Sequence, residues 1–407
     1  MEIIRVGMVG LGGRGFGLMK SCVMPRANVR VTAVCDLYQD RVERAADYVQ
    51  QQTGVRPLAT QDYREVTSSK DVDCVIITGA WECHLPVAMN AMENGKFTAT
   101  EVGGAYSLED CFDLVRTYER TGMHCMMLEN CCYGRRELMV TRMVREGLFG
   151  EIVHCDGGYQ HDLRTEIAYG EENRHYRLRN YTYRNCENYP THELGPIAKI
   201  LDVNRGNRML SLVSMGSSAK GLHEFIRTDE KANKELLNVD IAQGDVINTI
   251  IKCARGQTIT LTLDTTLPRS YCRNFTVRGT KGMYEERTDS VFLDGKDNKY
   301  DFNWAPRWGC AKEYEVEYEH PIWDKFIHDG VRGGHGGMDW LEFDALFAAI
   351  EGGYEPPIDT YDTAAWMSIT PLTEQSLSLG GAPVAIPDFT HGMWTHRPER
   401  KDWEFLI

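Results

Sequence analysis

The sequence predicts an α/β protein with two domains: an N-terminal doubly wound parallel sheet, and a C-terminal α+β domain with a large, mostly antiparallel open sheet. Three observations support this prediction. Short apolar runs alternate with amphipathic segments up to about residue 129. A glycine-rich turn follows the first of these runs. Beyond residue 150, strand-like runs follow one another without helices between them, as they do in hairpins.

Five apolar runs define the first domain, which we expect over residues 1–129. Helices are expected between the runs, near residues 14–24, 39–52, 84–94 and 107–121. In a sheet of this kind, ligands bind outside the carboxyl ends of the strands. The runs are Ile3–Val9, Val29–Cys35, Asp73–Ile77, Phe97–Thr100 and His124–Leu128, and they end on Gly10, Asp36, Thr78, Glu101 and Glu129. These five end residues are therefore predicted to line one pocket.

The first two strand ends indicate what the pocket binds. Residues 10–15 form a G-x-G-x-x-G turn between a strand and a helix, which is typical of the Rossmann fold. Asp36 follows about 20 residues later, where a carboxylate accepts both ribose hydroxyl protons. The predicted cofactor is NAD, with NADP as an alternative because Arg41 is close. Trp81 and His84 are expected to flank the cofactor or to pack. The predicted cofactor-binding residues are Gly10, Gly12, Gly13, Arg14, Gly15, Asp36, Thr78, Trp81, His84, Glu101, Glu129 and Asn130.

Composition excludes several classes of protein. A chain of 407 residues, 42% hydrophobic, is long enough for two cores, and its formal charge of −14 argues against a nucleic-acid or anionic-membrane partner. No apolar run approaches the ~20 residues that span a bilayer. The first strand already begins at Ile3, so we expect no signal peptide. The 13 cysteines include no C-x-x-C pair and favour reduced thiols in a cytoplasmic protein, without a zinc or other metal site.

The second domain is expected over residues 130–380, followed by an irregular tail at 381–407. Its open sheet would leave an apolar face in solvent, so a homo-oligomer formed through that face is one expectation. We predict a helix at Glu137–Glu146, hairpins of Asp245–Cys253 with Gln257–Thr265 and of Asn274–Arg278 with Met283–Arg287, and helices at Met338–Glu351 and Thr360–Leu379.

The segment from Tyr159 to Tyr189 is unusual in composition. It holds six tyrosines and five arginines, among them Arg164, and is expected to be a long loop. Aromatic faces with hydroxyl and guanidinium donors suit a sugar ring, which is apolar on its C–H faces and polar around its rim. The segment is therefore predicted to bind a carbohydrate, with Arg164 among its contacts. The alternative is a solvated interdomain or dimer-contact loop.

Two histidines are candidates for the substrate site. His192 stands just before a helix that we expect to start near Pro196, where an imidazole can take a proton as a hydroxyl loses hydride. A capping or packing role is the alternative. His335 lies among four glycines, in a mobile loop that we interpret as a substrate-site lid. The alternative is a glycine-rich turn with an exposed histidine.

Several strings of residues carry a resemblance to known proteins. The first domain resembles the glucose-fructose oxidoreductase and inositol dehydrogenase (Gfo/Idh/MocA) superfamily. Nearly the whole chain is similar to its NAD-dependent branch, glycoside hydrolase family 109, which comprises α-N-acetylgalactosaminidases. The strings are Gly10–Gly15, Thr78–His84, Glu129–Arg135, Asn188–His192 with Leu194–Pro196, Gly334–Asp339 and Ile386–Thr390.

The resemblance implies hydrolysis by a redox route on an α-N-acetylgalactosaminide or a related glycoside. The sugar is oxidised at C3, the aglycone leaves by elimination, water adds at C1, and C3 is reduced again with the cofactor retained. By similarity, Tyr189 and His192 serve the C3 hydroxyl and hydride step, and Tyr159 exchanges the C2 proton. Glu129 would touch the nicotinamide ribose or the substrate; an anchoring role is its alternative.

Three departures from the family pattern bear on this interpretation. The usual Glu-Lys-Pro is Glu101-Val102-Gly103, so the catalytic lysine of simple dehydrogenases is missing and the proline is also replaced. Glu193 stands where a glycine is expected, and we interpret it as orienting His192, contacting substrate or altering specificity. A secretion signal is common in the branch, and we expect none here. The alternatives to hydrolysis are a sugar or polyol dehydrogenase and a non-catalytic NAD- or sugar-sensing protein.

Overall fold

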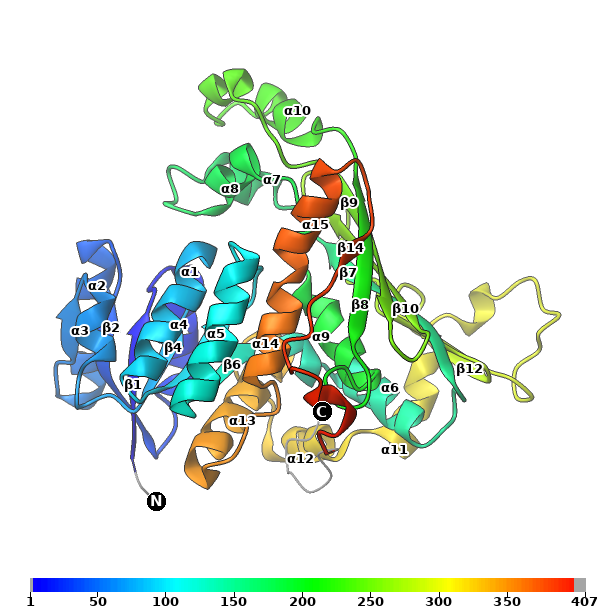
Figure 1. Ribbon diagram of the computed structural model, residues 1–407, viewed down its shortest axis with the longest axis horizontal. Helices are drawn as coiled ribbons and strands as arrows, with labels where there is room; N and C mark the ends of the chain where they lie inside the picture. Colours follow the sequence, from blue (N-terminus) through cyan, green and yellow to red (C-terminus); the bar gives the residue numbers. More distant parts are fainter. Residues whose placement is uncertain (1–2, 399–407) are drawn as a thin grey trace. The chain divides into compact units, whose positions relative to one another are not determined.

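The computed structural model describes residues 3–398, which form two compact units (Figure 1). The first unit contains the residues up to Tyr133 together with Lys325–Ala365. The second contains Gly134–Asp324 together with the described residues from Trp366 onward. No helix in the described part of the chain is long and apolar enough to cross a membrane.

A six-stranded parallel sheet forms the core of the first unit. Its strand order is β3-β2-β1-β4-β5-β6, so the order reverses between β1 and β4, as in a doubly wound sheet. Strands β4 and β6 are buried along their whole length, which explains why they are continuous apolar runs in the sequence. The strands are β1 (Ile4–Val9), β2 (Val29–Cys35), β3 (Leu58–Thr60), β4 (Cys74–Ile77), β5 (Phe97–Glu101) and β6 (Cys125–Leu128).

Helices connect these strands at the positions that the sequence predicts. Helix α5 begins with a capping box between Ser107 and Asp110 and ends at Gly122, which is left-handed. The connecting elements are α1 (Gly13–Leu18) with the π-helical turn η1 (Met19–Val23), α2 (Gln39–Thr53), α3 (Tyr63–Thr67), η2 (Trp81–Cys83), α4 (His84–Glu93), α5 (Leu108–Thr121) and η3 (Asn130–Tyr133). Strand β3 and the short helix α3 were not expected from the sequence.

A late segment of the chain completes the first unit. Helix α12 (Pro321–Asp329) leads into it, η7 (His335–Gly337) and α13 (Met338–Gly352) lie within it, and α14 (Thr360–Met367) leads out of it. The guanidinium of Arg26 lies 4.2 Å from the ring centre of Trp340, and Thr360 Oγ1 accepts the Cys125 N–H at 3.0 Å. The sequence analysis assigned residues 325–365 to its second domain, whereas here they pack with the first unit.

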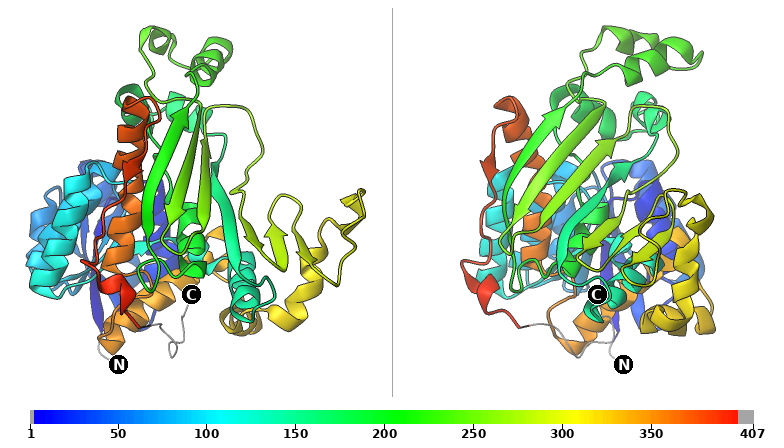
Figure 2. Two further views of the ribbon diagram at one scale, coloured as in Figure 1. Left: turned by 45° about the vertical axis from the view of Figure 1, so that its right-hand side comes forward. Right: turned by 90° about the vertical axis from the view of Figure 1, so that its right-hand side faces the viewer.

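An eight-stranded sheet dominates the second unit (Figure 2). The order is β13-β12-β11-β7-β10-β9-β8-β14, and only β7 and β10 are parallel. Strand β9 alternates between exposed and buried residues, as expected for a sheet with one covered face. The strands are β7 (Ile152–Gln160), β8 (Met209–Gly216), β9 (Val246–Cys253), β10 (Thr258–Asp264), β11 (Thr276–Gly279), β12 (Gly282–Glu285), β13 (Ser290–Leu293) and β14 (Val384–Ala385).

Helices of the second unit lie along this sheet and in its connections. Two of them, α9 and α15, pack against β7 and β8 respectively. The elements are α6 (Arg135–Arg145), α7 (Arg164–Ala168), α8 (Arg177–Tyr183), α9 (Thr191–Ile200), α10 (Gly221–Thr228), η4 (Lys234–Asn238), η5 (Ala305–Arg307), η6 (Cys310–Tyr314), α11 (Glu315–Tyr318), α15 (Ile369–Ser378) and η8 (Met393–Thr395).

Four details differ from the sequence predictions. The segment 159–189 is not a structureless loop, because it contains α7 and α8. The helix expected at Thr360–Leu379 is two helices that meet at Ser368. Helix α9 begins at Thr191, five residues before Pro196. The tail includes the short strand β14, which pairs with β8, and its residues 399–407 lie outside the described part of the chain.

Candidate functional site

The glycine-rich turn has two kinds of glycine. A Cβ on Gly10 would lie 2.3 Å from the backbone nitrogen of Gly79, and one on Gly15 would lie 2.1 Å from the Gly10 carbonyl oxygen. These two glycines are required by internal packing. Beside Gly13 nothing lies within 4 Å, and beside Gly12 only Arg41 does, at 3.7 Å. The backbone at Gly12 and Gly13 is therefore open to a ligand, as a pyrophosphate requires.

Asp36 is fixed beside this turn at the end of β2. Its Oδ2 accepts the Leu11 N–H at 2.7 Å and its Oδ1 accepts the Tyr38 N–H at 3.0 Å, and the residue is 8% exposed. Each carboxylate oxygen keeps a second lone pair for a ribose hydroxyl. Arg41 Nη1 lies 3.9 Å from Oδ2, and its guanidinium stacks on Tyr38. The positive charge of Arg41 is thus balanced by Asp36, which favours NAD over NADP.

Thr78, His84 and Trp81 shape the turn through backbone and packing contacts. Thr78 Oγ1 donates to the Gly10 carbonyl at 2.5 Å, and His84 Nε2 lies 3.1 Å from the Gly79 carbonyl. Burial lowers the pKa of His84, so its imidazole is neutral at neutral pH. Trp81 is buried against Gly103. In this structure the contacts of these three residues hold the turn in place.

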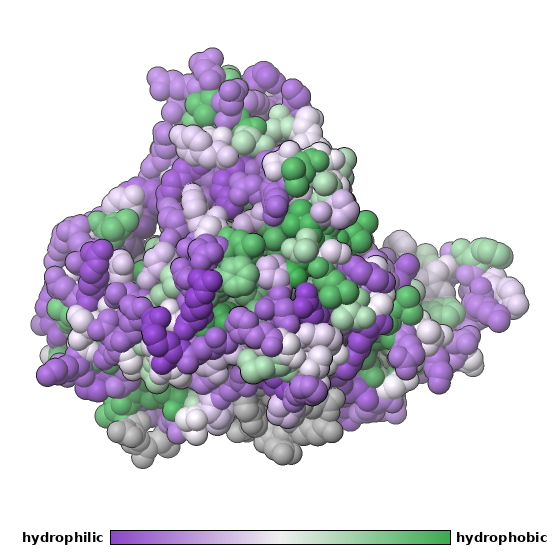
Figure 3. Space-filling model, in the orientation of Figure 1, coloured by the Kyte–Doolittle hydropathy of each residue, from purple (hydrophilic) through white to green (hydrophobic). Residues whose placement is uncertain are grey.

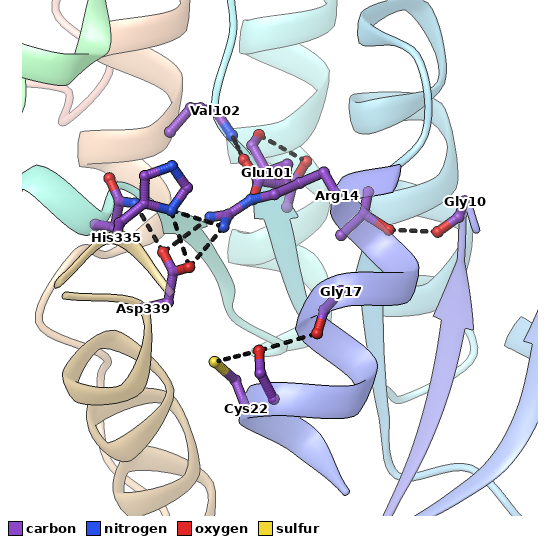
Figure 4. A network of polar contacts seen from close by, with 12 residues as sticks. Gly10, Arg14, Gly17, Cys22, Glu101, Val102, His335 and Asp339 are labelled. Carbon is purple, nitrogen blue, oxygen red and sulfur yellow. Dashed lines mark hydrogen bonds and ion pairs between the residues drawn. The ribbon is translucent and has the colours of Figure 1, made fainter. Parts of the chain in front are cut away.

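Arg14 is the centre of a polar network that joins four segments of the first unit (Figure 4). Its Nε donates to Glu101 Oε1 at 2.6 Å, and its Nη1 and Nη2 donate to the two oxygens of Asp339 at 2.6 and 3.0 Å. Asn130 Nδ2 also donates to Asp339, at 2.7 Å. Burial alone would raise the pKa of Asp339, but hydrogen bonds from His335 and Arg14 and the charge of Arg14 hold it well below its usual range.

His335 is held against this network. Its Nδ1 lies 3.0 Å from Asp339 Oδ2 and 3.1 Å from Arg14 Nη1, so Nδ1 either donates to the carboxylate or accepts from the guanidinium, according to its tautomer. The side chain is 54% exposed, and the backbone is left-handed at His335, Gly336 and Gly337. The glycine-rich segment therefore presents the imidazole at the surface of the first unit with one ring nitrogen fixed. Its assignment as a substrate-site lid remains a prediction.

Two buried carboxyl groups lie close to the network. Glu129, at the end of β6, accepts the Cys131 N–H at 3.1 Å. Glu342 on α13 is fully buried, and burial together with the negative charges of Asp339, Glu101 and Glu129 raises its pKa well above the usual range. Burial and these neighbouring charges therefore favour the protonated form of Glu342. Sequence reasoning did not name Asp339 or Glu342, although Asp339 ends the string Gly334–Asp339 on which the resemblance partly rests.

An aromatic cluster in the second unit gathers the three predicted catalytic residues. Tyr159 lies at the end of β7, and its ring centre is 4.3 Å from that of Tyr189 and 5.3 Å from that of His192. Tyr189 and His192 are 4.8 Å apart, edge to face. Gly158 permits this placement, because a Cβ there would lie 2.1 Å from the Thr262 carbonyl oxygen of β10. Two phenols and an imidazole thus share one small region.

Three further residues extend this aromatic cluster: sequence reasoning included His161 and Arg177 only in the composition of the segment 159–189, and it did not mention Tyr271. His161 stacks on Tyr159 at 5.7 Å, and Tyr271 lies 5.1 Å from His161. The guanidinium of Arg177 lies 5.0 Å from the centre of the Tyr189 ring. Burial and then the charge of Arg177 lower the pKa of His161, which makes it a neutral imidazole at neutral pH.

Two residues predicted to contact substrate have other partners in the structure. Arg164 donates to both oxygens of Asp162, at 2.9 and 2.7 Å. Glu193 is 0% exposed, and its Oε1 lies 3.2 Å from Nε of Arg273, which also pairs with Glu137. A role in substrate binding stays a prediction for both residues.

Comparisons with known proteins now add to this geometry. Residues 133–396 match the family model described as "Glycosyl hydrolase 109, C-terminal domain". The chain belongs to glycosyl hydrolase family 109. Residues 4–129 match "Oxidoreductase family, NAD-binding Rossmann fold", which confirms the predicted cofactor and the predicted fold of the first unit.

Individual members of family 109 resemble the chain over most of its length. An α-N-acetylgalactosaminidase of Tannerella forsythia is 35% identical over 97% of this chain and 88% of its own length, and one of Shewanella oneidensis is 36% identical over 97% and 87%. Levoglucosan dehydrogenase in complex with NADH and levoglucosan has the same fold, with a TM-score of 0.67 at 16% identity, covering 95% of this chain and 100% of the dehydrogenase.

The structure explains two departures from the pattern of family 109. Gly103 stands where the resemblance leads us to expect a proline, and its φ of +137° is one that proline does not adopt; a Cβ there would also lie 2.3 Å from Cδ1 of Trp81. Glu193 stands where the resemblance leads us to expect a glycine, and Gly157 on β7 makes room for it, because a Cβ at Gly157 would lie 2.6 Å from the Glu193 Cβ.

Proposed function

We propose that this protein is an NAD-dependent glycoside hydrolase that acts on α-N-acetylgalactosaminides or closely related glycosides. One observation carries the proposal: Tyr159, Tyr189 and His192 converge in one aromatic cluster, in a chain of family 109 whose first unit is an NAD-binding domain. The cluster offers phenols and imidazoles for proton transfer, in place of the paired carboxylates of conventional glycosidases.

The proposed reaction proceeds by transient oxidation at C3, elimination of the aglycone, addition of water at C1 and reduction at C3. When bound, NAD supplies a reversible hydride acceptor. His192 takes the proton of the C3 hydroxyl and later returns it, with Tyr189 beside it to donate a hydrogen bond to the same oxygen. Tyr159 removes and replaces the proton at C2, which the neighbouring ketone acidifies.

Charges and ring contacts of the described residues support these roles. The guanidinium of Arg177 lies over Tyr189 and interacts electrostatically with Tyr159, which brings a positive charge to the cluster. His161 stacks on Tyr159 and limits the orientations of its ring. The apolar faces of the two tyrosines suit the C–H faces of a sugar, and the hydroxyl groups suit its rim.

The test is a set of nitrophenyl glycosides, α and β, assayed with and without added NAD. We expect release of nitrophenol from the α-N-acetylgalactosaminide, no matching rise in reduced-nicotinamide absorbance, and incorporation of solvent deuterium at C2. Stoichiometric reduction of NAD without release of nitrophenol would instead establish a sugar or polyol dehydrogenase.

An apolar area of the second unit supports a homo-oligomer. Leu210, Met215, Ile250 and Leu379 are exposed large apolar residues, and Figure 3 shows apolar surface gathered where α15, β14 and β8 meet. We propose that this side of the open sheet pairs with a second copy of the chain. Light scattering should then give a molar mass at least twice the 46.3 kDa of one chain, and the substitution Ile250→Lys should lower the measured mass. A monomer at every concentration would contradict the proposal.

The state of the cysteines supports a reducing compartment. All 13 cysteines are free thiols in the structure, and all but Cys83 and Cys272 are buried. We propose a cytoplasmic location on this basis. Fractionation of the source cells checks it, and recovery of the protein outside the cytoplasm would contradict it.

A further inference from the structure

Glu187 lies two residues before Tyr189, and hydrogen bonds hold its main chain in place. Its backbone N–H donates to Thr373 Oγ1 at 3.0 Å, and its carbonyl accepts from Thr370 Oγ1 at 2.6 Å. Both threonines belong to α15. The main chain of Glu187 is therefore fixed by a helix on one side, and the turn that leads to His192 starts from this fixed point.

The side chain of Glu187 is buried with little to stabilise a charge. It is 0% exposed; Oε1 accepts the Tyr189 N–H at 3.4 Å, and Oε2 has no hydrogen-bond partner among the described residues. An ionised carboxylate with a single long hydrogen bond is costly in such a place. Burial raises the pKa of Glu187 to about 8, against the opposing effect of the Tyr189 N–H.

The groups that face Glu187 do not provide a free positive charge. Arg184, the cation in the same segment, is paired with Glu374 of α15, with Nη2 and Oε2 2.7 Å apart. Burial raises the pKa of the Cys186 thiol to about 12, so that thiol is neutral. From α15 the hydroxyls of Thr370 and Thr373 bond to the main chain of Glu187, and from the segment itself the Tyr189 N–H bonds to its carboxyl group.

We propose that Glu187 is a positioning residue that works as a neutral carboxylic acid. By accepting the Tyr189 N–H, it closes the turn that presents Tyr189 and His192. Loss of its proton places an unbalanced negative charge inside that turn and displaces both catalytic side chains. The inference rests on the proposed function, because that function assigns Tyr189 and His192 their roles.

Enzyme kinetics against pH give the first test. Glu187→Gln keeps the acceptor oxygen and cannot ionise, so its kcat at pH 7 should stay within about threefold of wild type. The alkaline limb of the plot of kcat against pH, which we expect near pH 8 in the wild type, should move to higher pH in this variant. Glu187→Ala removes the acceptor and should lower kcat about 10- to 100-fold. Glu224→Gln on α10, which removes a carboxylate from an exposed ion pair with Arg227, is the control and should leave the limb unchanged. An unchanged limb in Glu187→Gln would overturn the inference.

Unfolding against pH gives a second test that does not depend on activity. The pKa of Glu187 in the folded protein lies above its unfolded value. The contribution of the neutral carboxyl to the free energy of unfolding is therefore fully present below about pH 4.5 and is lost as the pH rises to about 8. Wild type should lose stability relative to Glu187→Gln across that window, and a constant difference would contradict the inference. If Glu187→Gln does not fold, infrared spectroscopy of the wild type replaces the unfolding test. A carbonyl band of a protonated carboxyl should then be present and be lost near pH 8, and absence of the band would overturn the inference.

The two tests also separate the inference from the proposed function. If no glycoside is cleaved but wild type still loses stability relative to Glu187→Gln between pH 4.5 and 8, the proposed function fails and the neutral acid stands. If glycosides are cleaved and neither the stability difference nor the alkaline limb responds to Glu187→Gln, the inference alone fails.

Discussion

The ion pair between Arg14 and Asp339 provides a measurable test of how the dinucleotide site is held together. Asp339 is 1% exposed and accepts hydrogen bonds from two nitrogens of Arg14 and from Asn130. The substitution Asp339→Asn preserves the shape of the side chain. It removes the negative charge and replaces one carboxylate oxygen by an NH₂ group, which cannot accept a hydrogen bond from the surrounding donors.

The expected magnitude follows from the contacts that remain. Leaving a buried charge with no partner costs about 3–5 kcal/mol. Arg14 keeps its bond to Glu101 in the variant, so the loss is smaller than that. A hydrogen bond to a charged group contributes about 1.5–3 kcal/mol. We therefore expect Asp339→Asn to lower the unfolding free energy by about 2–3 kcal/mol.

A double-mutant cycle with Arg14→Met measures the pairwise part of this effect by urea unfolding. The cycle should give a coupling of at least about 1 kcal/mol, and NAD affinity by calorimetry should fall in both single variants. Asp113→Asn, in the exposed pair with Arg116, is the control and should change nothing measurable. Because the pKa of Asp339 is held low, its contribution is present above the unfolded pKa and is lost as the pH falls through the folded value. A coupling of zero would refute this account of the network.

Three further substitutions test other parts of the site. Asp36→Ala should weaken NAD binding and relax discrimination against NADP, and equal NAD affinity would remove Asp36 from the site. His192→Ala should lower the rate about 10²–10⁴-fold with NAD affinity nearly unchanged, and near-wild-type turnover would refute the mechanism. Gly103→Ala should cost about 2–4 kcal/mol of stability, because it combines a positive φ with a clash against Trp81, and a neutral effect in thermal unfolding would contradict that interpretation.

The sequence predicted the first unit well because its signals are local. Strand β2 and helix α2 were expected within one residue of their observed bounds, since apolar period and turn residues set them. The addition of Lys325–Ala365 was not predictable in the same way. That segment joins the unit through contacts such as Arg26 with Trp340, which are separated by more than 300 residues and leave no local pattern.

The candidate site was predictable to a similar extent. His192 was named in advance from its place before a helix, and Tyr159 and Tyr189 from the family resemblance, and the structure brings the three together. The same segment holds five arginines, and their spacing does not show which of them reaches the cluster. Arg177 lies over Tyr189, whereas Arg164 pairs with Asp162. Glu187 was also missed, because nothing in a sequence shows that a glutamate is buried without a cation.

The late segment that completes the first unit has a consequence for biosynthesis. A ribosome releases the six strands of the parallel sheet long before it has made α13, so Asp339 reaches Arg14 only after most of the chain exists. Until then Trp340, Phe343 and Phe347, which are buried in the finished protein, have not been made, and the surface that they cover remains in water. The site around Arg14 is therefore complete only when the last fifth of the chain is being made, and a fragment cut after residue 133 would lack this segment and be prone to aggregation.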